Sequence, residues 1–109
     1  FDAPWSPKRI GRVDSYDVKL AKGEGRFAWH AHQDEDELFF ITSGILRIDF
    51  EDRDPVRLHP GEMTIIPKGV RHQPVVEEGP VHILLFEKAG VVNTGDAETG
   101  DLTQSIEDI

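Results

Sequence analysis

Short segments of alternating apolar and polar residues recur about every ten residues along this 109-residue chain, with turn residues between them. Tyr16, Val18 and Leu20, for example, alternate with polar residues, which predicts a half-buried strand. The expected strands lie within residues 14–23, 26–32, 37–44, 45–52, 56–58, 63–69, 72–80 and 81–90. Turns are expected at 22–25, 43–44, 60–61, 67–69 and 78–80. This spacing predicts an all-β sandwich or barrel.

The length predicts a single domain with a marginal core, which oligomerisation would help to stabilise. Residues 1–12 contain two prolines and no periodicity, and we expect an irregular N-terminal arm that ends in a short strand. Residues 13–90 then form the barrel. Residues 91–109 form an acidic tail, with a short helix expected at its end.

The net charge of −9 argues against nucleic acid and against anionic membrane surfaces as partners. The chain has no apolar stretch long enough to span a membrane, and its first residues lack a signal-peptide pattern, so a cytoplasmic location is expected. The chain has no cysteine, so no disulfide can form and a metal ion would need nitrogen and oxygen ligands.

The segment WHAHQDEDELFF places imidazoles and carboxylates directly before an apolar run. On a strand, His30 and His32 point the same way, roughly 7 Å apart. Glu37 opens the next strand, where a charge needs a partner such as a metal ion. The competing interpretation is a solvated hairpin whose acids pair with lysines, and this segment alone does not choose between the two. Residues 34–36 are expected to be the solvated turn of that hairpin.

The second half of the chain adds His72, which follows the tight turn at 67–69. Two motifs then become visible. The first runs Gly25, four residues, His30, His32, four residues, Glu37, six residues, Gly44; the second runs Gly61, five residues, Pro67, Gly69, two residues, His72. In both motifs the sequence resembles the cupin family, and it is similar to small cupins loosely related to mannose-6-phosphate isomerase. It departs from the family pattern in a first gap one residue shorter and in Val76, where the family has Asn.

The resemblance implies a jelly-roll barrel of two antiparallel sheets, with one metal ion bound at the barrel mouth by His30, His32, Glu37 and His72. Three neutral imidazoles and one carboxylate would leave a divalent ion with a net charge of about +1 and two open positions. Iron, manganese, nickel, cobalt and zinc all suit these ligands, and the sequence does not choose among them. A small-molecule ligand and a homodimer are also implied.

Other residues are weaker site candidates, because a purely structural role explains each of them. His59 is expected at the surface, and Arg71 is expected in a surface ion pair rather than beside an anionic substrate. His82 either lines the pocket or is simply buried, and Trp29 is expected in packing or a dimer interface. Phe39, Ile41, Met63 and Ile65 are expected either in the pocket wall or in the core.

Three functions fit such a site. The first is a metal enzyme acting on a small polar molecule, with dioxygenases, decarboxylases and isomerases known on this fold. The second is a non-catalytic sensor or binding module, and the third is a structural metal, which usually has a closed coordination sphere. We also predict a homodimer with the arm at its interface, where Phe1, Trp5 and Ile10 would contact the partner.

Overall fold

The computed structural model describes residues 3–90 and 107–108, and within them it contains strands and turns but no helix. The strands are β1 Lys8–Val13, β2 Tyr16–Arg26, β3 Glu37–Ser43, β4 Leu46–Phe50, β5 Val56–Leu58, β6 Met63–Ile66, β7 His72–Lys88 and β8 Glu107–Asp108. They form an eight-stranded sheet in the order β5-β4-β7-β2-β1-β8, with β3 paired to β7 and β6 paired to β3. All pairs are antiparallel except β1 with β8. The all-β prediction is confirmed, and the arrangement is that of a jelly roll.

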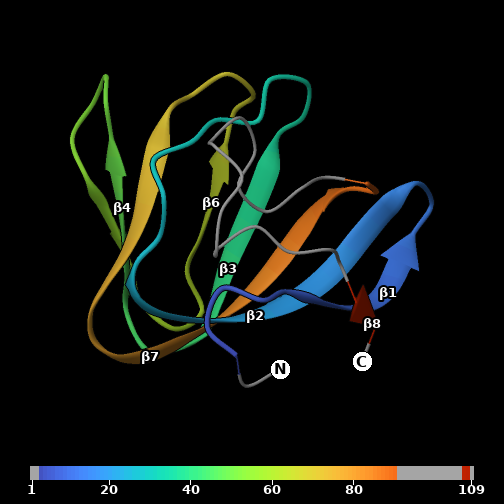
Figure 1. Cartoon of the computed structure of the whole chain (residues 1–109), viewed down its shortest axis with the longest axis horizontal. Helices are drawn as coiled ribbons and strands as arrows, with labels where there is room; N and C mark the ends of the chain where they lie inside the picture. Colours follow the sequence, from blue (N-terminus) through green and yellow to red (C-terminus); the bar gives the residue numbers. More distant parts are fainter. Residues whose placement is uncertain (1–2, 91–106, 109) are drawn as a thin grey trace.

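Strand β7 joins the two halves of the barrel (Figure 1). Its first residues, 72–75, pair with β4, and residues 75–76 also pair with the end of β2. Residues 81–88 pair with β2 on one side, and residues 82–87 pair with β3 on the other. Between these parts the strand bends through exposed residues, and Gly79 there has a φ of 73°. The bend folds the sheet over on itself, so that the inner faces of its two halves enclose the core.

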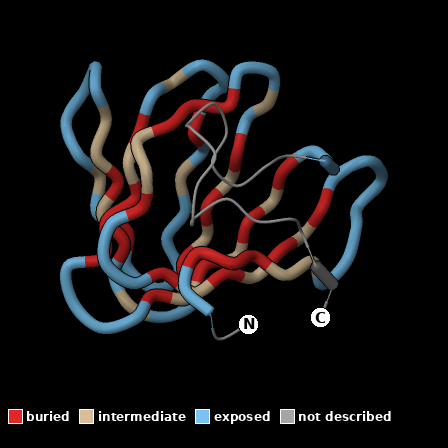
Figure 2. Tube along the Cα trace, in the orientation of Figure 1, coloured by how far each residue is buried: buried red, intermediate tan, exposed pale blue. Residues whose placement is uncertain are grey.

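The core consists of buried side chains from both halves, and Figure 2 shows that the buried residues lie within the strands whereas the connecting loops are mostly exposed. Leu46 and Ile48 come from β4, Ile41 from β3 and Ile83 from β7, and none of them exceeds 2% exposure. Burying each such side chain contributes roughly 1.5–3 kcal/mol.

Strand β2 buries the face opposite to the one that its alternation suggests. Tyr16 is 43% exposed and Val18 and Leu20 are only half-buried, whereas Asp17 and Lys19 are buried at 1% and 0% exposure. The polar residues of this strand therefore face the interior, where charged partners hold them.

The strand expected at 26–32 is wrong. The turn expected at 22–25 is also wrong, because β2 continues to Arg26. The chain then leaves the sheet but stays attached to β7 through the Phe27 N–H, which donates to the Pro74 carbonyl at 2.9 Å, and through the bridge between His30 and His72. The turn expected at 78–80 is a bend within one continuous strand rather than a break between two.

The N-terminal segment packs on the chain's own barrel. The Trp5 backbone N–H donates to the Lys22 carbonyl at 2.7 Å, the Trp5 indole donates to the Glu24 carbonyl at 2.8 Å, and the ring is 8% exposed. Trp5 also packs against Phe27, with ring centroids 5.1 Å apart. The expectation that Trp5 covers a partner subunit is therefore wrong.

The predicted acidic tail lies mostly outside the described residues. Where a short helix was expected at its end, Glu107–Asp108 instead form strand β8. In the described part of the chain, no helix is long and apolar enough to cross a membrane.

Candidate metal centre

His30 and His72 face each other through a reciprocal backbone bridge. The N–H of each residue donates to the carbonyl of the other at 2.9 Å, and the two imidazole centroids lie 4.4 Å apart. His72 begins β7, whereas His30 belongs to the connection between β2 and β3. The bridge therefore fixes two segments distant in sequence as one unit, with both rings buried in the barrel.

Each of these imidazoles is oriented by a carbonyl two residues before it. Nδ1 of His30 lies 2.8 Å from the Ala28 oxygen, and Nδ1 of His72 lies 2.9 Å from the Val70 oxygen. Because a carbonyl only accepts hydrogen bonds, each Nδ1 must carry the proton and donate. Nε2 of each ring is then the nitrogen that would coordinate a metal ion, the arrangement usual for metal-binding histidines.

His32 and Glu37 complete the cluster from the loop and from the start of β3. Nε2 of His32 is 3.6 Å from Glu37 Oε2, and Nε2 of His72 is 4.0 Å from Glu37 Oε1. Both His32 and Glu37 are buried, at 5% and 4% exposure. All four predicted residues thus converge, although His30 and His32 lie on a non-strand segment rather than on the expected strand.

The loop that carries the histidines is attached to the turn at 67–69. The Gly69 N–H donates to the His32 carbonyl at 2.8 Å, and the Lys68 N–H donates to the Asp36 carboxylate at 2.9 Å. Gly69 has a φ of +78°, a left-handed conformation that glycine adopts without a Cβ clash. Asp36, expected to be merely solvated, therefore helps to hold the histidine loop in place.

The cluster fits a divalent ion. His30, Glu37 and His72 offer ligand atoms that all lie within 4.8 Å of one another, and so do His32, Glu37 and Glu87. The donors are imidazole nitrogens and carboxylate oxygens, which first-row transition metals bind well. Ionised Glu37 also leaves Oε1 buried with no hydrogen-bond donor in the part of the chain that the structure describes, which is a costly state without a cation.

A row of acidic residues crosses the inside of the barrel beside these histidines. Glu37 on β3 pairs in register with Glu87 on β7, and Glu87 pairs in register with Asp17 on β2. Lys19 Nζ donates to Glu87 Oε1 at 2.6 Å, and both side chains are buried. At the far end of the row, Arg12 donates to Asp17 at 3.0 Å.

Glu87, Lys19 and Asp17 are not among the candidate site residues predicted from the sequence. The sequence does carry a signal for two of them. Asp17 in DSYDVKLAKG and Glu87 in VHILLFEKAG each lie an even number of residues from a core residue, Ala21 and Leu85 respectively, and so face the same side of the strand. This signal could be recognised only once the register between the strands was known.

Burial raises the pKa of the Glu37 carboxyl well above its usual range. Repulsion from Glu87 and a hydrogen bond shared with it act in the same direction, while Lys19 opposes them. A metal ion would reverse this balance, because a cation at the cluster favours the ionised carboxylate.

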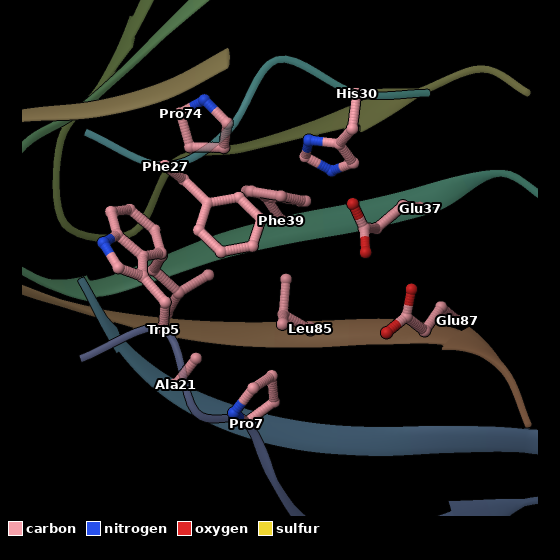
Figure 3. Close-up of a pocket in the computed structure, with 11 residues that line it drawn as sticks. Trp5, Pro7, Ala21, Phe27, His30, Glu37, Phe39, Pro74, Leu85 and Glu87 are labelled. Atoms are coloured by element: carbon pink, nitrogen blue, oxygen red, sulfur yellow. The ribbon is translucent and has the colours of Figure 1, made fainter. Parts of the chain in front are cut away.

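A cavity of about 40 Å³ adjoins the cluster (Figure 3). His30, Glu37 and Glu87 lie at one side, the rings of Trp5 and Phe27 lie at the other, and Phe39 lies between them. A water molecule needs roughly 10–15 Å³ of cavity volume, so this cavity has room for about three water molecules. It can receive a compact ligand with an apolar part.

The remaining candidates lie away from the cluster. His59 is exposed and contacts Glu62 at 3.0 Å, and Arg71 is exposed and pairs with Glu51 at 3.2 Å. His82 alternates with the core residues of β7 and so points away from the cavity, while Trp29 is half-buried. Met63 and Ile65 are 58% and 55% exposed, so their expected place in a pocket wall or core is wrong, whereas Phe39 lines the cavity and Ile41 is in the core.

Comparison with known proteins agrees with this architecture. The chain is 41% identical over 64 residues to the uncharacterized protein YdbB of Bacillus subtilis (strain 168), a match that covers 59% of this chain and 57% of that protein. The chain thus matches little more than half of the length of this curated relative.

Two solved structures are similar over most of their length. A cupin-2 domain containing protein from Shewanella frigidimarina NCIMB 400 is 43% identical, with a TM-score of 0.76 over 81% of this chain and 84% of the other. Protein NMB1881 from Neisseria meningitidis is 30% identical, with a TM-score of 0.73 over 82% of this chain and 89% of the other. The family model described as Cupin domain matches residues 16–87. The chain therefore belongs to the cupin family.

Proposed function

We propose that the protein binds one divalent transition metal ion through His30, His32, Glu37 and His72 and uses it to bind and transform a small chelating molecule inside the barrel. The observation that carries the proposal is the convergence of these buried side chains, with ligand atoms of three of them within 4.8 Å. The bonds from His30 and His72 Nδ1 to backbone carbonyls support it, because they orient the rings before any ion arrives.

The chain's own residues define what the site does to a ligand. The histidines and Glu37 hold a single negative charge among neutral donors, and the aromatic rings of the cavity keep water from the ligand's apolar part. When bound, a divalent ion would supply Lewis-acid activation of an oxygen atom of the ligand. Three imidazoles and one carboxylate leave two positions of an octahedral ion for that ligand.

Some solved structures of similar fold are enzymes. A hydroquinone 1,2-dioxygenase was solved in complex with Cd²⁺ and 4-hydroxybenzonitrile, at 20% identity and a TM-score of 0.69, and a sugar phosphate isomerase from Silicibacter pomeroyi is 22% identical with a TM-score of 0.66. At these identities the likeness concerns the fold alone, so the reaction of this protein rests on its site. The alternative is a non-catalytic binding or sensor cupin, favoured because the residues that line the cavity include no Ser, Thr, Cys, Lys or Tyr side chain.

The metal assignment is tested by the metal content of purified variants. His30→Ala, His32→Ala, Glu37→Ala and His72→Ala should each weaken metal binding by about 100-fold or more, since loss of outer-shell partners alone costs 10–100-fold. His59→Ala is the matched control and should bind metal as the wild type does. Metal should also dissociate on acidification, because the imidazoles must be neutral to coordinate. Full metal content in both His32→Ala and His72→Ala would refute the assignment.

Turnover separates the enzyme from the binding module. The manganese, iron, nickel and cobalt forms are mixed in air with small diketones, thiols and sugar phosphates, and products are measured alongside thermal shifts. Product formation that His72→Ala abolishes supports the enzyme. Chelators that stabilise every metal form by mass action, without any product, support the binding module.

We further infer that the protein is a homodimer through the outer face of the sheet formed by β2, β7, β3 and β6. Two apolar rows cross this face in register, namely Leu20, Leu84, Phe40 and Met63, and Val18, Phe86, Leu38 and Ile65. The exposure of Met63 and Ile65, at 58% and 55%, supports this inference, because contiguous apolar patches commonly mark interfaces.

A further inference from the structure

Glu87 lies deep in the barrel with its two carboxylate oxygens in different surroundings. Oε1 accepts a hydrogen bond from Lys19 Nζ at 2.6 Å, and both residues are at most 2% exposed. Oε2 is also buried, and with both glutamates ionised it has no hydrogen-bond donor among the described residues. A buried carboxylate oxygen without a donor is costly, so a donor from outside the protein chain is expected there.

The position of Oε2 indicates what that donor is. Glu87 lines the cavity together with Glu37 and His30, and Figure 3 shows the two carboxyl groups at the same end of it. Glu87, Glu37 and His32 offer atoms within 4.8 Å of one another. A molecule coordinated by the proposed metal ion would therefore lie within hydrogen-bonding range of Glu87.

Lys19 explains why Glu87 would bind a ligand rather than the metal ion. Its ammonium group already neutralises the Glu87 carboxylate in the buried ion pair. A carboxylate that shares its charge with a lysine is a weaker metal ligand, but it remains a strong hydrogen-bond acceptor. The pair also adds no net charge to the site, so an anionic chelator is not repelled by it.

We propose that Glu87 is a ligand-binding residue that selects chelators whose coordinating oxygen carries a proton, such as small α-hydroxy acids and α-hydroxy ketones. This inference rests on the proposed function, since the metal ion holds the chelator in place. The hydroxyl group coordinates the ion and donates its proton to Glu87 Oε2, while a short apolar body lies against Phe39 and Leu85. The cavity of about 40 Å³ limits that body to a few carbon atoms.

The test compares glycolate with methoxyacetate, which offers the same two coordinating oxygens but no hydroxyl proton. Binding to the cobalt-loaded full chain is followed by the change in the visible spectrum. The variant is Lys19→Met/Glu87→Gln, which removes both charges together and so avoids leaving a buried charge unpaired. Lys19→Gln/Glu87→Gln is a second uncharged pair in case the first does not fold. Asp17→Asn is the matched control, because Asp17 is a buried acid of the same row but does not line the cavity.

We expect the preference for glycolate over methoxyacetate to fall about tenfold or more in the charge-pair variants and to stay at the wild-type value in Asp17→Asn, since a hydrogen bond to a charged group is worth at least that factor. Cobalt content should be unchanged in all of them. An unchanged preference would mean that Glu87 binds only water, and a loss of cobalt would mean that Glu87 is itself a metal ligand; either result overturns the inference and leaves the proposed metal site standing. A wild-type protein that binds no metal would instead overturn the proposed function together with this inference.

Discussion

Glu37 and Glu87 face each other in register across β3 and β7, with both carboxyl groups inside the barrel. Like charges directly opposite each other destabilise a sheet. Lys19 compensates one of the two charges through its bond to Glu87. The second charge has no such partner in the described chain, so the fold carries an electrostatic cost that a cation would remove.

This cost predicts how the stability of the metal-free protein depends on pH. The pKa of Glu37 is raised above 4.5, chiefly by burial. The contribution of protonated Glu37 to the free energy of unfolding is therefore fully present below the unfolded-state pKa and is lost as pH rises through the higher folded-state pKa. In the metal-free protein Glu37→Gln should therefore become the more stable of the two as pH rises, and its advantage should grow from the unfolded-state pKa up to the raised folded-state pKa. Thermal denaturation of both proteins measures this difference, and an advantage that shrinks as pH rises would contradict it.

The Lys19–Glu87 pair makes a prediction about stability that is separate from ligand binding. Lys19→Met leaves a second carboxylate buried without its cation and should cost about 3–5 kcal/mol. Lys19→Met/Glu87→Leu removes both charges and should restore most of that loss. Urea denaturation of the metal-free proteins gives the two values. Equal losses in the single and double variants would mean that the pair is not coupled.

Trp5 predicts that the N-terminal segment contributes to the stability of its own barrel. Trp5→Ala removes a ring that is 8% exposed and an indole bond to Glu24, and it should cost about 3–5 kcal/mol. Trp29→Ala, at a half-buried position, is the control and should cost clearly less. Equal effects in denaturant titrations would place Trp5 outside the core.

The outer face predicts the oligomeric state. Met63→Lys/Ile65→Lys should convert a homodimer into a monomer near the chain mass of 12.3 kDa, because it buries two charges at the interface. Ile45→Lys is the matched control, since Ile45 is 46% exposed but lies outside the two apolar rows. Light scattering at micromolar concentration measures both. A wild-type protein that is already monomeric would refute the dimer.

The sequence predicted the fold class, and it indicated four candidate metal ligands that lie close together in the structure, because both predictions depend on local signals. Strand alternation, turn residues and the motif glycines can all be recognised from the amino-acid sequence alone. Gly44, for instance, has a φ of +82°, and a Cβ there would lie 2.6 Å from the Pro80 carbonyl oxygen, so the motif position admits little else.

The inward face of β2 could not be predicted because it depends on partners far away in the sequence. Lys19 is buried by its bond to Glu87, which is 68 residues later, and Asp17 by its bond to Arg12 across the hairpin. Tyr16, Val18 and Leu20 form an equally apolar outer face, and Tyr16 stacks on Phe86 with centroids 5.2 Å apart. Alternation alone gives two faces and does not say which of them is inside.

The bend in β7 changes which residues of the strand face inward. Before it, the even-numbered residues His72, Pro74 and Val76 are buried, together with Val75, and after it only the odd-numbered residues from Val81 to Glu87 are buried. In a straight strand, two residues face the same side only if they are an even number of positions apart, yet His72 and Glu87 are an odd number of positions apart. The bend at the four exposed residues 77–80 therefore shifts the alternation of β7 by one residue, so that both His72 and Glu87 face the interior. Insertion or deletion of one residue there would turn one arm of β7 inside out, so the length of this surface bend should be as restricted as the identity of the buried site residues.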